Sequence, residues 1–240
     1  LLDVLLPIFL EETGYNVKTI AVGTGAALAL GQKGEADVLL CHAPAAEMEL
    51  VEAGDVVNRQ LVMHNDFVIV GSPEDPAKVK GSKFAADALK KIVETESVFV
   101  SRADDSGTDK KEKEIWNSVD IQPSGQEWYL EAGTGMANTL NIANEKLAYC
   151  LTDRGTYLSM KDNLDLVILV EGDAVLLNIY HVMQVNPDKH KVVDGSGGEA
   201  FVKFMVSDDV QAIIKEFGVD KFGSPLFFPD AGKSMEELGG

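Results

Sequence analysis

The chain has 240 residues, of which 45% are hydrophobic and 25% are charged, so it can bury its own core without disulfides or metals. Its 39 acidic residues outnumber its 21 basic residues, which gives a formal net charge of −18. An extended nucleic-acid or anionic membrane surface would repel such a chain, and no apolar run approaches the roughly 18 residues of a membrane span. What remains is a globular protein in which any anion must be held at a local site.

The first predicted element is a helix over residues 1–13, which Gly14 ends. Residues 16–22 are expected to form a strand, and the turn over 23–25 leads into a helix over 26–30. An α/β lobe usually opens with its central strand. No strand precedes the first helix here, so we expect the chain to begin just after the first strand of such a lobe.

Strands and helices then alternate along the chain. Further strands are expected at 37–41, within 61–71, and at 97–101, 147–151 and 175–185. Further helices are expected from Pro44 and Thr152 and at 84–96, 109–119, 137–144, 198–207 and 209–217. This alternation predicts an α/β fold of two lobes, each a mainly parallel sheet flanked by helices. We place the first lobe at 1–97 with 181–240 and the second at 98–180.

Cysteine and histidine patterns give no sign of catalysis or of a metal site. Cys41 and Cys150 each lie in an apolar run and are expected to be small buried side chains. No Cys-x-x-Cys or paired-histidine spacing occurs, and no nucleophile, base and carboxylate assemble as a triad. We therefore expect a protein that is not an enzyme and needs no cofactor. His42 follows a strand and is a candidate for lining a cleft, whereas Trp116 and Trp128 are expected to pack the second lobe.

Five loops follow candidate strands, where open α/β sheets bind their ligands. These loops cover residues 23–26, 42–44, 101–109, 133–136 and 152–155. Several of them place small residues at a helix start, where free backbone N–H groups and the helix dipole favour an anion. An anion-binding site built mainly from backbone donors is consistent with the acidic composition.

The strongest candidate segment is 101–112. Ser106, Gly107 and Thr108 can present hydroxyls and a bare N–H at a helix start, and the guanidinium of Arg102 can reach the same point. The alternative is that Asp105 or Ser106 only caps the helix and Arg102 pairs with Asp104 or Asp105. Arg154 has two similar interpretations, a second anion contact or an ion pair at a helix start.

Several stretches together resemble the tungstate-binding component of bacterial tungstate ABC transporters. They are residues 2–7, 22–25, 34–38, 42–45, 65–71, 101–112 and 223–227. The resemblance implies a type II periplasmic-binding-protein fold, related to the molybdate- and sulfate-binding proteins. It implies a monomer, periplasmic or anchored at the cell surface, that captures tungstate or molybdate between its lobes and delivers it to an ABC permease, with no nucleic acid as partner.

The resemblance also implies a site in which the oxyanion is held by hydrogen bonds and no metal. Arg102 would neutralise charge. Hydroxyl or backbone donors would come from Thr24, Gly25, Ser106, Gly107, Thr108, Gly135 and Met136.

Three departures from the family pattern stand out. Ala103 occupies a position that is usually glycine, and Asp109 one that is usually histidine. The family's Thr/Ser-rich first binding loop would precede Leu1.

The alternative function is the effector-binding domain of a LysR-type transcriptional regulator, which shares the two-lobed fold. The sequence upstream of Leu1 distinguishes the two.

Overall fold

The computed structural model describes residues 1–234 and 236–238, which form two compact units. Unit 1 comprises Leu1–His64 and Asn178–Glu237, and unit 2 comprises Asn65–Leu177 with Leu238. The second boundary lies close to the expected one at 180, but the first differs because residues 65–97 belong to unit 2. The reason is β2 (Val56–Gly71), a 16-residue strand that carries the chain from one unit into the other.

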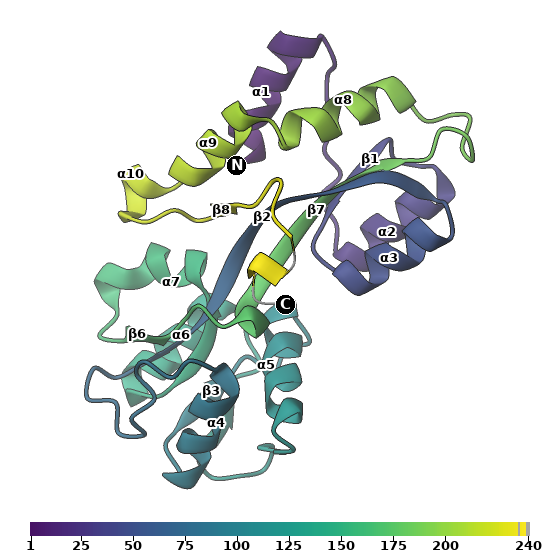
Figure 1. Ribbon diagram of the computed structural model, residues 1–240. Coiled ribbons are helices and arrows are strands. Elements are labelled where there is room, and N and C mark those ends of the chain that lie inside the picture. The colour runs from purple at the N-terminus through teal and green to yellow at the C-terminus, as the bar shows by residue number, and fades with distance from the viewer. Residues whose placement is uncertain (235, 239–240) are drawn as a thin grey trace. The chain divides into compact units, whose positions relative to one another are not determined.

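Unit 1 is a sheet covered by helices on both faces. Its elements besides the start of β2 are α1 (Leu2–Thr13), α2 (Thr24–Lys33), β1 (Val38–Cys41), α3 (Pro44–Glu52), β7 (Leu177–Val185), α8 (Gly195–Met205), α9 (Asp208–Glu216), α10 (Val219–Phe222) and β8 (Phe228–Pro229). Because side chains alternate along a strand, Val38 and Leu40 pack with α1, α8 and α9, whereas Leu39 and Cys41 pack with α2 and α3. Figure 1 shows the two groups of helices.

Unit 2 repeats this arrangement. After β2 it contains α4 (Ala85–Glu94), β3 (Phe99–Ser101), α5 (Gly107–Ser118), β4 (Tyr129–Glu131), α6 (Met136–Lys146), β5 (Cys150–Asp153), α7 (Arg154–Met160), β6 (Val167–Val170) and the 3-10 turns η1 (Lys161–Asn163) and η2 (Ala174–Leu176). Phe67 and Ile69 of β2 join the core beneath α4 and α5, and Val68 and Val70 join the core beneath α6 and α7. The α/β fold with helices on both sheet faces is confirmed.

The expectation of mainly parallel sheets is wrong for the ladders of the described residues. β1 pairs antiparallel with β7, and β2 pairs antiparallel with β5, β6 and β8. Among the described residues, β3 and β4 form a parallel ladder, which a parallel bridge between Phe99 and Tyr149 extends. Continuous apolar runs predicted parallel strands, but such runs indicate burial on both faces, and helix-covered antiparallel strands meet that condition equally well.

Residues 16–22 do not form the expected strand. All of them except Val17 are exposed, and none joins a ladder with the described residues, so the segment has the alternation of a strand but no neighbour. A groove of about 610 Å³ lies between this segment and β1, lined also by Leu2, Leu6 and Phe9 of α1. Among the described residues β1 pairs with β7 alone, so its other edge has no partner strand in this part of the chain.

The cysteines and tryptophans lie where the sequence predicted. Cys41 and Cys150 are free and buried, with 1% and 0% of their surface exposed. Trp116 and Trp128 pack with Tyr129 and Phe99 in the core of unit 2, with ring centroids 5.4–6.1 Å apart. In the part of the chain that the structure describes, every helix is too short or too polar to cross a bilayer.

Candidate anion-binding site

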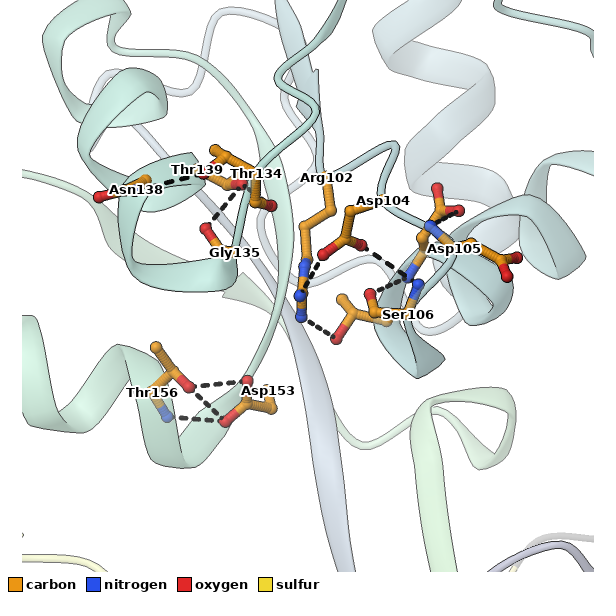
Figure 2. Close-up of polar contacts among 12 residues, drawn as sticks. Arg102, Asp104, Asp105, Ser106, Thr134, Gly135, Asn138, Thr139, Asp153 and Thr156 are labelled. Carbon is orange, nitrogen blue, oxygen red and sulfur yellow. Dashed lines mark hydrogen bonds and ion pairs between the residues drawn. The ribbon is translucent and has the colours of Figure 1, made fainter. Parts of the chain in front are cut away.

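The turns that follow β3 and β4 lie side by side in unit 2. The two strands are parallel neighbours, so their carboxyl ends meet at one edge of the sheet. The backbone N–H of Thr134, in the second turn, donates to the carbonyl of Arg102, in the first turn, over 3.3 Å. Figure 2 shows the Arg102 side chain extending between the Thr134–Gly135 turn and the 104–106 turn. The structure thus brings Arg102 together with the starts of α5 and α6.

The guanidinium of Arg102 has N–H groups that are not used by acceptors in the part of the protein that the structure describes. One terminal nitrogen contacts a carboxylate oxygen of Asp104 at 2.5 Å, and the other lies 3.4 Å from the hydroxyl of Thr108. Its Nε is buried and has no partner among the described residues. An unpartnered buried donor is costly unless something binds there, so the guanidinium is suited to an added acceptor.

Two helices point open N-termini at this place. Ser106 caps α5 by accepting from the N–H of Asp109 over 3.3 Å, which leaves the N–H groups of Gly107 and Thr108 without partners among the described residues. At α6 the capping residue is Gly135, which has no side-chain cap to offer, and the N–H of Met136 is likewise open. Unsatisfied N–H groups at the positive end of a helix are donors for an anion.

The start of α7, the next helix along the chain, does not leave its N–H groups open for a ligand. The carboxylate of Asp153 caps α7 by accepting from the N–H of Thr156 over 2.7 Å. The negative charge at the start of this helix is therefore supplied by the protein's own side chain. Arg154 is also occupied, because it pairs with Asp66 at 2.6 Å and with Glu171 at 2.7 Å. Of the two interpretations of Arg154, the ion pair is the one that the structure shows.

Gly107 and Gly135 are exposed and have no conformational need to be glycine. Neither has a positive φ, and a Cβ built at either position meets no protein atom within 4 Å. The neighbouring Gly133 differs, since its φ of 61° lies in the left-handed region that favours glycine. The bare backbone at Gly107 and Gly135 therefore leaves space in which a ligand can reach the N–H groups.

The side chains of the remaining expected residues of unit 2 are buried. Met136 is 7% exposed and packs beside Leu140 in the core, so only its backbone can serve a ligand. Thr108 is 6% exposed and turns its hydroxyl toward Arg102.

Two buried carboxylates lie along α5 behind the site. Asp109 is fully buried, pairs with Lys113 at 2.7 Å and accepts from the N–H of Asp105 over 3.1 Å. Glu112 is 2% exposed and accepts from the hydroxyl of Tyr129 over 2.6 Å and from the indole N–H of Trp116 over 3.2 Å. Burial raises the pKa of Glu112 to about 7, and the neighbouring charge of Asp109 adds to the rise.

Glu112 was not predicted from the sequence as part of this region. The signal was available, because Glu112 shares the i, i+3, i+4 spacing of the buried Ile115 and Trp116 on the same helix.

Thr24 and Gly25 lie in unit 1 at the start of α2, which also lacks a side-chain cap. The Thr24 hydroxyl is 3.2 Å from Nε2 of His42, so the turns at 23–25 and 42–43 are neighbours. A Cβ at Gly25 would meet open space. Unit 1 thus offers donors of the same kind as unit 2.

The turn at 42–43 is bonded to a buried carboxylate, that of Glu47, which was not predicted from the sequence. Glu47 is fully buried and accepts from the N–H of Ala43 at 2.9 Å, from Arg59 at 2.8 Å and from Nδ1 of His181 at 2.9 Å. Burial alone would raise the pKa of Glu47, but these hydrogen bonds and the charge of His181 outweigh it and leave the pKa below its ordinary value.

Known proteins resemble the chain over most of its length. Residues 1–209 match the PBP superfamily domain. The tungstate-binding protein TupA of Peptoclostridium acidaminophilum is 50% identical over 235 residues, which are 97% of this chain and 82% of that protein.

Two solved structures extend the comparison. A tungstate-binding protein TupA from Desulfovibrio alaskensis G20 is 45% identical, with a TM-score of 0.90 over 96% of this chain and 93% of its own. A tungstate ABC transporter structure from Geobacter sulfurreducens is 44% identical, with a TM-score of 0.71 over 90% of this chain and 92% of its own. The chain therefore belongs to the PBP superfamily and, within it, to the family of the TupA tungstate-binding proteins.

Proposed function

We propose that the protein is a solute-binding protein that captures tungstate, with molybdate as the close competitor, for uptake by an ABC transporter. The observation that carries the proposal is the set of open donors in unit 2, which combines Arg102 with the N-termini of α5 and α6. Relatives that are 44–50% identical carry the name of tungstate-binding proteins or of a tungstate transporter. Binding here makes and breaks no covalent bond.

The donors suit a small dianion with acceptor oxygens on every side. The guanidinium supplies a full positive charge, and each open helix N-terminus adds a partial one. The N–H groups of Gly107, Thr108, Gly135 and Met136 are fixed by the backbone, so little ordering is required when the ligand arrives. Thr24 and Gly25 belong to unit 1, and their part in binding stays a prediction from the sequence.

The transport setting is part of the proposal. Membership in a family of solute-binding proteins of ABC transporters supports a periplasmic or surface-anchored protein that delivers its oxyanion to a membrane permease. That it acts as a monomer stays a prediction. The net charge of −18 opposes any nucleic-acid partner.

Calorimetry and thermal unfolding of this chain with tungstate, molybdate and sulfate test the function, with chloride as the control anion. A ligand present at 100 times its dissociation constant stabilises the fold by about 2.7 kcal/mol, which is visible as a rise in melting temperature. We expect tungstate and molybdate to produce the rise and chloride to produce none. If none of the three oxyanions binds, the proposal is wrong.

A further inference from the structure

The carboxylate of Asp104 makes the contacts of a bound anion. One oxygen lies 2.5 Å from a terminal nitrogen of Arg102, and the other accepts from the backbone N–H of Ser106 over 3.2 Å. A guanidinium and an N–H at the start of α5 are also the donors assigned to the oxyanion. Figure 2 shows Asp104 between Arg102 and Ser106, bonded to both.

The position of Asp104 depends on a turn that the sequence does not favour. Ala103 and Asp105, on either side of it, have φ values of 47° and 59°. This left-handed region costs a residue such as Ala103 about 1–2 kcal/mol, whereas aspartate enters it more readily. The side chain of Asp104 is 21% exposed, so it can leave Arg102 for water without unfolding its surroundings. By contrast, Asp109 and Glu112 are at most 2% exposed and cannot leave in this way.

We propose that Asp104 is a built-in competitor, an internal anion that occupies part of the oxyanion site until a stronger ligand displaces it. This inference rests on the function proposed above. An anion that takes up all the donors of Arg102 must replace the charge-assisted contact of Asp104 to Arg102 and its hydrogen bond to Ser106. The free energy needed for this is the same for each such ligand. Weakly bound anions such as chloride then fail to occupy the site at their ambient concentrations, whereas a dianion that fills the whole donor set still binds.

The test replaces Asp104 with its neutral isostere and uses two tetrahedral probes. Tungstate and perrhenate have the same shape but differ by one charge. Affinities for both are measured by calorimetry in the wild type, in Asp104→Asn and in Asp105→Asn. Asp105→Asn is the matched control, because it changes the net charge equally at a side chain that is 87% exposed and faces Lys110 at 3.6 Å.

We expect Asp104→Asn to bind tungstate and perrhenate about tenfold more tightly, by a common factor, while Asp105→Asn leaves both affinities near the wild-type values. We also expect added sodium chloride to weaken tungstate binding more in Asp104→Asn than in Asp105→Asn, because chloride then competes for free donors. Melting temperatures of the three proteins establish that each is folded.

Three results would overturn the inference. Weaker tungstate binding by Asp104→Asn would mean that the carboxylate positions Arg102 for the ligand. A gain limited to tungstate would indicate charge repulsion rather than competition for donors, and unchanged affinities would leave Asp104 without influence. If the wild type binds tungstate and one of these results is found, only this inference is contradicted. If the wild type binds no oxyanion, the proposed function is contradicted as well.

Discussion

In the proposed site, Arg102 is the residue on which we expect oxyanion binding to depend most directly. Its role in the fold is small, because a partly exposed pair such as that with Asp104 contributes about 0–1 kcal/mol. We therefore expect Arg102→Ala to abolish tungstate binding in calorimetry while the melting temperature changes by only a few degrees.

Arg154→Ala is the contrasting variant. It leaves Asp66, 5% exposed, without its bidentate partner, and loss of such a partner costs about 3 kcal/mol or more. We expect this variant to lose stability but to keep its affinity. Unchanged binding by Arg102→Ala would contradict the site assignment.

Glu112 makes stability depend on pH in a definite direction. Its pKa rises from 4.5 to about 7 on folding, so the folded protein holds a proton there that the unfolded chain has released. This contribution is complete below pH 4.5 and is lost as the pH rises through 7, and it amounts to roughly 3 kcal/mol at most. We expect Glu112→Gln to be more stable than the wild type at pH 8 and to lose that advantage by pH 5.

Urea unfolding at pH 5, 6, 7 and 8 measures the difference between wild type and variant. Glu114→Gln, on the same helix at a side chain that is 58% exposed, controls for the loss of a surface charge. Stability curves of wild type and Glu112→Gln that run parallel over this pH range would show that Glu112 does not titrate as described.

Local features of the candidate site were predictable where a sequence rule identifies them. Small and hydroxyl residues at a helix start indicated Ser106–Thr108, and strand-end placement indicated Arg102. The structure also supplies a reason for the family's glycine at position 103, since Ala103 has a φ of 47°. Glu47 was not predictable, because its partners Arg59 and His181 lie 12 and 134 residues away along the chain and no local sequence pattern indicates such contacts.

At the scale of elements, Gly135 and Gly133 of one turn are expected to behave in opposite ways. Alanine at Gly135 meets no protein atom, so the fold should keep its stability, but the added methyl group lies where a ligand approaches the backbone. Alanine at Gly133 must adopt a left-handed conformation at a cost of about 1 kcal/mol.

We expect Gly135→Ala to lose tenfold or more in tungstate affinity at an unchanged melting temperature, and Gly107→Ala to do the same at α5. Gly133→Ala should show a lower melting temperature. Calorimetry and thermal unfolding of the three variants check these outcomes. Full affinity in both Gly135→Ala and Gly107→Ala would exclude close approach of a ligand to these N–H groups.

Helices were predicted better than strands because their signals are local. The glycines that end α1 and α2 are visible in the sequence, and both adopt the left-handed conformation, at Gly14 and Gly34. The strands β4, β6 and β8 have two to four residues each and were missed, because only distant partners define them. The alternation in residues 16–22 predicted a strand, but a strand also needs a neighbour to pair with.

At the scale of the whole molecule, the acidic charge opposes the ligand until it is close. A net charge of −18 repels a dianion at long range, although Arg102 and the helix starts attract it at contact. The Debye length falls from about 30 Å at 0.01 M salt to about 8 Å at 0.15 M, so added salt screens the repulsion first.

We expect the association rate of tungstate to rise between these two salt concentrations, as measured by stopped-flow mixing. Asp105→Asn, with one negative charge fewer, should show a slightly smaller rise. An association rate that falls with salt would mean that the local positive field outweighs the net charge.

The packing of Trp116 and Trp128 in one core gives the protein an intrinsic fluorescent reporter of unit 2. The chain has no other tryptophan, so unit 1 contributes no tryptophan emission, while both units contribute to far-ultraviolet circular dichroism. Trp116 lies on α5 and donates to Glu112, so its emission is sensitive both to events at the start of that helix and to the protonation of this carboxylate. Comparing tryptophan emission with far-ultraviolet circular dichroism during unfolding shows, without any added label, whether the two units unfold together or one at a time.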